Sequence, residues 1–299
     1  MPFLLPAALE QLRALPAPLL ALLLPSLAAA AAAAAAACRA RRAPALSSAY
    51  AAFPIKSRTV ANHGARPVVF LTLPVSTASL PTGAHVKVRA TINGEETTRS
   101  YTPTRFHAGE CELMVRVYAG GPMSTHLAAL RPGDSLRMMG PTGIERYGER
   151  GPGSFSRGER VWEGMRHVGL ISGGTGITPM LQIANHVLQD PADATRLSLV
   201  SFTSSVEDIA LEDTLLALAA GSAGALRVTF AASAASAAEL AARPHARLAS
   251  MRSLSPAGLA ALLGLPPGRR TMVCVCGPDG FVLAAKKLLA PAFENVIVW

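Results

Sequence analysis

Residues 167–180, HVGLISGGTGITPM, decide the fold of this 299-residue chain. The apolar run His167–Ser172 predicts a buried strand, the turn Gly173–Gly176 follows it, and a helix is expected near Pro179–Gln189. Glycines between a strand and a helix let the backbone approach a pyrophosphate, which then lies at the helix N-terminus. The six-residue GxGxxG fingerprint is absent, so a generic tight turn is the alternative interpretation.

Outward from this turn, strands and helices alternate to the C-terminus. Alternating β and α elements indicate a doubly wound parallel sheet, which we expect over residues 161–299. Residues 231–253, a low-complexity stretch of Ala, Ser and Arg, give no pattern from which an element can be predicted. The predicted strands are Arg196–Phe202, Leu226–Phe230, Thr271–Cys276 and Asn295–Trp299, and the predicted helices are Val206–Ala220, Pro256–Leu263 and Asp279–Leu289.

Before residue 160 the pattern is that of short β-branched strands. Pro67–Leu73, His85–Ile92 and Glu112–Tyr118 are separated by turn signals at Asn93-Gly94, Arg131–Asp134 and Gly140–Gly143. This pattern predicts a small antiparallel β-barrel over residues 58–160. Residues 43–57 are expected to be a linker, and residues 146–165, rich in Gly, Arg and Ser, a connection between the two domains.

The first 42 residues form a separate segment. Between Arg13 and Arg39 lie 25 uncharged residues that end in ten alanines, Ala28–Ala37. This length can cross a bilayer core of about 30 Å, and Arg39, Arg41 and Arg42 would keep the following body in the cytosol. A cleaved signal peptide and an organelle transit peptide are the alternatives, and three prolines weaken the prediction of a helix.

The charge is spread unevenly. The formal net charge is +9, but six of the 28 basic and one of the 19 acidic residues lie in residues 1–60, which leaves 22 basic and 18 acidic residues. A body with a net charge of +4 is not typical of a nucleic-acid-binding protein, and we expect no such partner. Four arginines in loop-like segments are expected to form an exposed basic rim, or else only to solvate their loops: Arg105, Arg146, Arg150 and Arg157.

The four cysteines exclude two further classes. Cys38, Cys111, Cys274 and Cys276 have neither the spacing of metal ligands nor that of a secreted disulfide scaffold. We therefore expect reduced thiols in an intracellular protein and no metal site.

Two motifs of the predicted barrel carry binding chemistry. Arg99-Ser100-Tyr101-Thr102-Pro103 offers a guanidinium for a phosphate, an aromatic face and hydroxyls on a rigid turn. Gly120-Gly121-Pro122-Met123-Ser124 opens a short helix, whose backbone N–H groups could hold an anion. Each motif alone could also be an ordinary strand end or helix cap.

Two candidate binding features of the predicted α/β domain follow the ends of its strands. Cys276-Gly277-Pro278-Asp279-Gly280-Phe281 lies where a late strand ends, at the edge that lines the ligand crevice of such sheets. Asp208 follows the second strand, 34 residues beyond Gly174, where an acid commonly contacts an adenosine ribose. The alternatives are a buried packing cysteine and an acid that only favours a helix N-terminus.

Together these motifs resemble those of the cytochrome b5 reductases, within the ferredoxin–NADP reductase superfamily, over roughly residues 54–299. The resemblance implies an FAD-binding barrel followed by an NADH-binding domain. By this resemblance, Arg99 would pair with the FAD pyrophosphate, Tyr101 would lie against the isoalloxazine, and Thr102 would form a hydrogen bond near flavin N5. Cys276 would lie beside the nicotinamide, and Asp208 would disfavour a 2′-phosphate. The other cofactor-binding residues implied are Ser100, Arg116, Tyr118, Gly121, Met123, Ser124, Gly174, Thr175, Gly176, Thr178, Pro179, Gly277, Pro278 and Phe281.

The resemblance implies that hydride passes from NADH to FAD and single electrons then pass to a haem protein such as cytochrome b5. The chain departs from the family at Pro122, where a lysine is usual, and at residues 231–253. An NADPH-using relative, a non-haem acceptor and a non-catalytic paralogue are the alternatives. A membrane-attached protein facing the cytosol, at the endoplasmic reticulum or mitochondrial outer membrane, is the expected location, with import into mitochondria as the alternative.

Overall fold

Antiparallel β-strands form the N-terminal half of the described chain. The computed structural model describes residues 43–61, 66–107 and 109–299, so the predicted anchor at 1–42 lies outside the described residues. Strands β4 (His85–Ile92) and β5 (Glu95–Tyr101) form a hairpin through Asn93-Gly94. Both turn residues have positive φ, 52° and 83°, as a two-residue hairpin turn requires.

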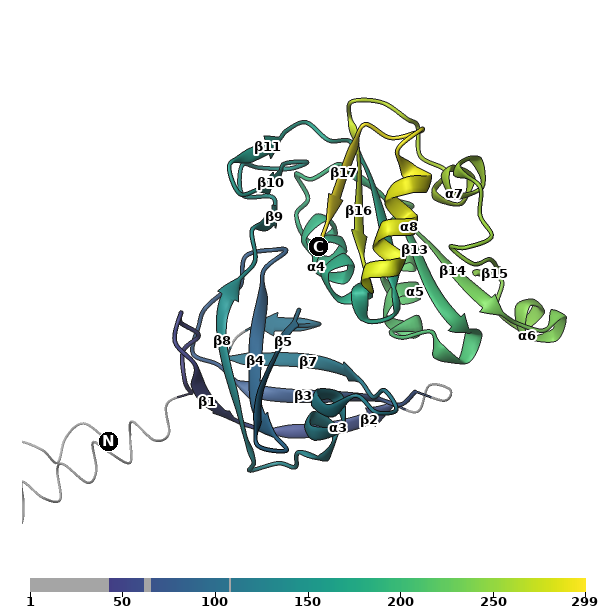
Figure 1. Cartoon of the computed structure of the whole chain (residues 1–299). Coiled ribbons are helices and arrows are strands. Elements are labelled where there is room, and N and C mark those ends of the chain that lie inside the picture. The colour runs from purple at the N-terminus through teal and green to yellow at the C-terminus, as the bar shows by residue number, and fades with distance from the viewer. Residues whose placement is uncertain (1–42, 62–65, 108) are drawn as a thin grey trace, which may run out of the picture. The chain divides into compact units, whose positions relative to one another are not determined.

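Two four-stranded antiparallel sheets make the barrel. Their orders are β1-β8-β4-β5 and β2-β3-β7-β6 (Figure 1). Alternate side chains such as Phe53, Val86, Val88 and Leu113 are fully buried between them. The remaining barrel elements are β1 (Ala51–Pro54), β2 (Ser57–Ala61), β3 (Val68–Pro74), β6 (Arg105–His107), β7 (Glu110–Arg116), α3 (Pro122–Ala129) and β8 (Ser135–Thr142).

A small three-stranded antiparallel sheet follows the barrel. It consists of β9 (Glu145–Tyr147), β10 (Phe155–Arg157) and β11 (Arg160–Trp162). The ring of Tyr147 is buried, and its hydroxyl lies 2.5 Å from Asp193 Oδ2 and accepts a hydrogen bond from Gly153 N at 3.2 Å. This phenol therefore ties the small sheet to the α/β half of the chain.

Six parallel strands form the C-terminal sheet, in the order β15-β14-β13-β12-β16-β17. The strand order reverses between β12 and β16, where doubly wound sheets bind their ligands. The elements are β12 (His167–Gly173), η1 (Gly174–Gly176), α4 (Ile177–Gln189), β13 (Arg196–Ser205), η2 (Val206–Asp208), α5 (Glu212–Gly221), β14 (Leu226–Ala234), α6 (Ala237–Ala242), β15 (Ala246–Leu248), α7 (Pro256–Leu263), β16 (Thr271–Cys276), α8 (Asp279–Leu289) and β17 (Asn295–Val298).

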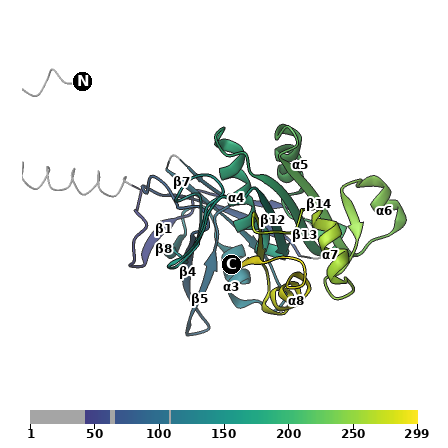
Figure 2. The same cartoon turned by 90° about the horizontal axis from the view of Figure 1, so that it is seen from above.

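Helices cover both faces of this sheet. Figure 2 shows α4 and α5 on one face and α7 and α8 on the other. Leu170 and Cys274 belong to the apolar cluster that contains α4 residues, whereas Ile171 and Val275 belong to the cluster beneath α7 and α8. Because both faces are covered, the strands read as continuous apolar runs, which is why they were visible in the sequence.

Three expectations about boundaries were wrong. The linker predicted at 43–57 contains β1, which pairs with β8, and Ser47 O accepts a hydrogen bond from Gly140 N at 2.9 Å. The predicted connection at 146–165 contains most of the small sheet, and Gly140–Thr142 ends β8 and is not a turn. These strands have three or four residues or interrupting Gly and Pro, too little for a period-two pattern to show.

The stretch at 231–253, for which no element was predicted, is partly regular. β14 continues to Ala234, and α6 begins with a capping box, in which Ser236 Oγ accepts from Glu239 N and Glu239 Oε2 accepts from Ser236 N. Within the described ranges, no helix combines the length and apolar character needed to cross a membrane.

Candidate functional site

Two strand ends meet with almost no side chain between them. A Cβ on Gly176 would collide with the carbonyl of Cys276, and a Cβ on Gly277 would lie 2.7 Å from the Phe281 ring and 3.2 Å from Gly173 Cα. The turn after β12 and the turn after β16 therefore pack backbone against backbone. This contact places the N-terminal end of α4 beside Cys276.

A cavity of about 500 Å³ opens at this point, between the strand ends and the barrel. Its size is that of a small-molecule or cofactor site. All sequence-predicted site residues except Gly174, Asp208, Pro278 and Phe281 line it. The lining residues are Arg99, Ser100, Tyr101, Thr102, Arg116, Tyr118, Gly121, Met123, Ser124, Thr175, Gly176, Thr178, Pro179, Cys276 and Gly277, joined by His85, Met114, Pro122, Glu145 and Trp299.

The end of β5 supplies a cation and an aromatic ring to this cavity. No carboxylate of the described chain lies within ion-pair distance of Arg99, whose Nη1 donates only to Thr98 O at 2.8 Å. Burial raises the pKa of Tyr101 to about 12, against a smaller opposite effect of Arg99. Tyr101 is therefore a neutral ring at physiological pH, beside a guanidinium that is free to bind an anion.

Helix α3 directs its N-terminus at the same cavity. Gly121 is its N-cap and Pro122 its first residue, a position where the missing N–H costs no helical hydrogen bond. Ser124 Oγ accepts from Tyr118 N at 3.2 Å and donates to Gly121 O at 3.1 Å. The serine thus fixes the turn, and the backbone N–H groups of the first helical turn are left for an anion.

Arg116 and Asp208 are buried together. Each residue is 4% exposed, Arg116 Nη2 donates to Asp208 O at 2.6 Å, and Nη1 lies 3.6 Å from Asp208 Oδ1. Burial lowers the pKa of Arg116, and the neighbouring carboxylate of Asp208 opposes that shift. Asp208 is thus at the end of β13 as expected, but in this structure its carboxylate faces an arginine of the barrel and lies outside the cavity.

Cys276 is a neutral thiol. Burial raises its pKa to about 12, the amide of Gly277 lowers it slightly, and the charge of Glu145 raises it further. A protonated thiol is a weak nucleophile, so the side chain can occupy the wall of the cavity without reacting.

Three further lining residues come from distant elements, and two of them, His85 and Glu145, were not anticipated from the sequence. His85 lies at the start of β4, Glu145 at the start of β9, and Trp299 at the C-terminus. Burial lowers the pKa of His85, Glu145 opposes this shift, and Lys87 and Arg146 add to it. Trp299 Nε1 donates to Gly83 O at 3.3 Å, which links the last residue of the chain to the barrel. No local motif marks these positions.

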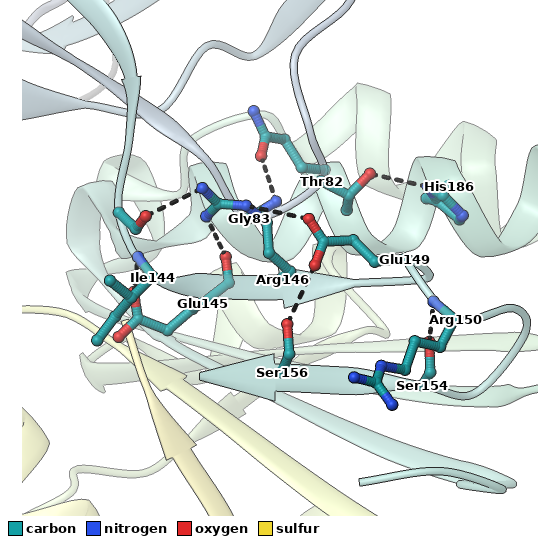
Figure 3. A network of polar contacts seen from close by, with 12 residues as sticks. Thr82, Gly83, Ile144, Glu145, Arg146, Glu149, Arg150, Ser154, Ser156 and His186 are labelled. Carbon is teal, nitrogen blue, oxygen red and sulfur yellow. Dashed lines mark hydrogen bonds and ion pairs between the residues drawn. The ribbon is translucent and has the colours of Figure 1, made fainter. Parts of the chain in front are cut away.

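Gln182 of α4 holds the two halves of the cavity in register. Its Oε1 accepts from Gly83 N at 3.1 Å, and its Nε2 donates to Pro103 O at 3.2 Å. Next to it, Thr82 Oγ1 and His186 Nδ1 are 2.8 Å apart (Figure 3). Pro103 directly follows Thr102, so the amide connects the end of β5 to the helix that follows the glycine turn.

Three predicted residues support the site from outside. Gly174 has φ of +58° and forms the turn, Pro278 is the N-cap of α8, and the Phe281 ring covers Gly173 and Gly277. Phe281 also packs 5.5 Å from the ring of Phe202. The resemblance placed these residues at the cofactor, and in this structure they shape the turns that line the cavity.

The four arginines of the predicted basic rim each form an ion pair. Arg105, Arg146, Arg150 and Arg157 pair with Glu112, Glu149, Glu163 and Glu145 respectively, at 3.0 to 3.8 Å. Arg146 is also largely buried and donates to the carbonyls of Glu145 and Gly143 (Figure 3). Three of the four side chains, those of Arg105, Arg150 and Arg157, are exposed as expected, whereas that of Arg146 is 16% exposed, and a role of this rim in attracting a partner stays a prediction.

Known proteins match both halves of this arrangement. The family described as oxidoreductase FAD-binding domain matches residues 52–147, and that described as oxidoreductase NAD-binding domain matches residues 170–287. NADH-cytochrome b5 reductase 1 of Laccaria bicolor is 35% identical over 212 residues, 70% of this chain and 62% of that protein. NADH-cytochrome b5 reductase 1 of Kluyveromyces lactis is 31% identical over 240 residues, 79% of this chain and 77% of that protein. The match thus spans less than two thirds of the first relative and more of the second.

A solved structure shares the fold. The cytochrome b5 reductase domain of Ulva prolifera nitrate reductase superposes with a TM-score of 0.73, over 86% of this chain and 100% of that chain, at 23% identity. The order of barrel and α/β sheet predicted from the sequence is confirmed.

We expect Cys276 to resist alkylation in the folded protein. With a pKa of about 12, only roughly one thiol in 10⁴ is ionised at pH 8, so iodoacetamide should modify Cys276 far more slowly than in urea. Peptide mass mapping over time measures this, and Glu145→Gln, which removes a charge that raises the pKa, should speed the reaction. Equal rates in folded and unfolded protein would contradict a protonated, buried thiol.

Proposed function

This chain belongs to the NADH–cytochrome b5 reductase family, and from that premise we propose that it oxidises NADH through bound FAD and reduces a haem protein such as cytochrome b5. The observation that carries the proposal is the single cavity in which the end of β5, the N-terminus of α3 and the two glycine turns meet. A barrel motif and two α/β motifs, distant in sequence, thereby share one site.

The residues present fit FAD. Arg99, which pairs with no carboxylate of the described residues, and the first turn of α3 offer donors for the phosphates, and the neutral ring of Tyr101 offers a face for an aromatic ring system. Arg116 lines the cavity, and its buried Nε has no hydrogen-bond partner within the described part of the chain, so this donor is left for an acceptor. When bound there, FAD would supply the capacity to take a hydride and to release electrons singly.

The residues of the chain would orient the reactants. The N-terminus of α4, with Thr175, Gly176 and Thr178, would hold the phosphates of NADH, because helix N-termini favour anions. Cys276, as a neutral thiol, would fill space beside the reacting ring without adding a charge. Gln182 would keep these groups aligned with Thr102, and such alignment dominates the rate of a transfer between two bound partners.

The cofactor is tested with purified full-length protein. We expect flavin absorption that bleaches on addition of NADH, and Tyr101→Ala should weaken FAD binding by about 10- to 100-fold, since a buried aromatic contact is worth roughly 1.5–3 kcal/mol. Equilibrium dialysis measures the affinity, and Tyr50→Ala, a tyrosine outside the cavity, is the matched control. A colourless protein that does not take up added FAD would refute the proposal.

Gln182→Ala should slow the reduction of bound flavin by NADH while leaving the FAD content unchanged. The substitution removes the two hydrogen bonds to Gly83 and Pro103 that align the halves, and none of these three residues lines the cavity. Stopped-flow absorbance should show a loss of about tenfold in the rate, the effect of about 1.4 kcal/mol in the barrier. Gln189→Ala, on the same helix, is the control, and a wild-type rate in Gln182→Ala would exclude the positioning role.

We propose further that residues 1–42 attach the protein to a membrane, with the body facing the cytosol, at the endoplasmic reticulum or the mitochondrial outer membrane. The uncharged stretch of 25 residues followed by Arg39, Arg41 and Arg42 supports this. Full-length protein should stay with membranes in alkaline carbonate, whereas a variant that starts at Ala43 should be released and keep its NADH–ferricyanide activity. Release of the full-length protein, or a mature N-terminus beyond residue 38, would favour import or cleavage.

A further inference from the structure

One buried ion pair joins the barrel to the α/β sheet. Arg116 ends β7, and Asp208 ends η2 directly after β13. Among the ion pairs of the described residues, it is the one whose two side chains are both buried, at 3% and 6% exposure. A charged contact of this kind between two domains is sensitive to anything that binds either partner.

The pair is incomplete. The closest approach between the charged groups is 3.6 Å, and neither Arg116 Nε nor Asp208 Oδ1, both buried, has a hydrogen-bond partner among the residues that the structure describes. The shortest hydrogen bond of the guanidinium runs from Arg116 Nη2 to the backbone carbonyl of Asp208, at 2.6 Å. Asp208 Oδ2, the second carboxylate oxygen, accepts a long hydrogen bond of 3.4 Å from Ser205 Oγ. Buried charges with unsatisfied atoms recover little of their desolvation cost, so each partner gains by taking a better ligand.

Arg116 and Asp208 belong to the regions proposed here for two different nucleotides. Arg116 lines the cavity that contains Arg99 and the N-terminus of α3, the place for an anionic cofactor. Asp208 follows the strand adjacent to β12 in a doubly wound sheet, the place where an acid receives ribose hydroxyls. The carboxylate that would bind the coenzyme ribose is therefore the one that restrains an arginine of the flavin site.

We propose that the Arg116–Asp208 pair couples the two nucleotide sites. A coenzyme ribose that takes the hydrogen bonds of Asp208 releases the Arg116 guanidinium toward the phosphates of the flavin cofactor, so each nucleotide strengthens the binding of the other. This inference rests on the proposed function. It gives Asp208 a role on the flavin side as well as on the coenzyme side.

The coupling is measurable without turnover. FAD is titrated into flavin-free full-length protein, with fluorescence quenching as the readout, with and without saturating NAD⁺, which has no hydride to transfer. NAD⁺ should tighten FAD binding in the wild type by about 5- to 30-fold, and FAD should tighten NAD⁺ binding by the same factor, because linkage is reciprocal. Asp208→Asn should abolish both effects.

Two further variants make the test decisive. Glu207→Gln removes the neighbouring exposed carboxylate and should keep the full coupling. Arg116→Met with Asp208→Asn removes both charges, which avoids a buried unpaired arginine that could unfold the protein, and should bind FAD with no response to NAD⁺. Coupling that persists in either Asp208 variant, or that is absent from the wild type, would overturn the inference. Failure of the wild type to bind FAD at all would instead overturn the proposed function.

Discussion

The close approach of two strand ends is the constraint on which the site depends. Because Gly176 lies against the carbonyl of Cys276, no side chain separates the turn after β12 from the turn after β16. That contact fixes where α4 begins, and the same helix carries Gln182, whose amide reaches the barrel at Gly83 and Pro103. A backbone contact at the switch point of the sheet is thus transmitted to the barrel through one rigid helix.

The electrostatics of the cavity depend on which charges are left unpaired. Each of the four arginines of the predicted rim forms an ion pair with a glutamate, and Glu145 brings a negative charge to the cavity wall. Donors for an anion come instead from Arg99, from the unpartnered Nε of Arg116 and from the helix N-termini. Such donors are positioned by the fold, so they bind an anion in one place and give the surface no general attraction for it.

Much of the fold was predictable because long elements carry their own signals. The strand Thr271–Cys276 and the helix Asp279–Leu289 have the predicted bounds, as does the strand His85–Ile92 with its Asn-Gly turn. β1 and the three strands of the small sheet were missed because an element of three or four residues has no measurable periodicity. Alanine hid α6, since a six-residue helix with four alanines, one glutamate and one leucine has no apolar face to detect.

The residues of the site likewise fall into those that a local motif marks and those that only the tertiary structure shows. Local motifs marked the groups at the strand ends, since glycine turns and cap residues are written in consecutive positions. Gln182 and Glu145 were missed because their roles depend on what the other domain presents to them. Asp208 shows the limit most sharply: its place after β13 was predicted, yet its partner lies 92 residues earlier in the chain. The sequence predicts a ribose-binding role for the carboxylate and a phosphate-binding role for the arginine separately. Only the fold shows that the two side chains lie in contact. The sequence can therefore name candidate binding groups, whereas the contact between Arg116 and Asp208 arises only from the fold.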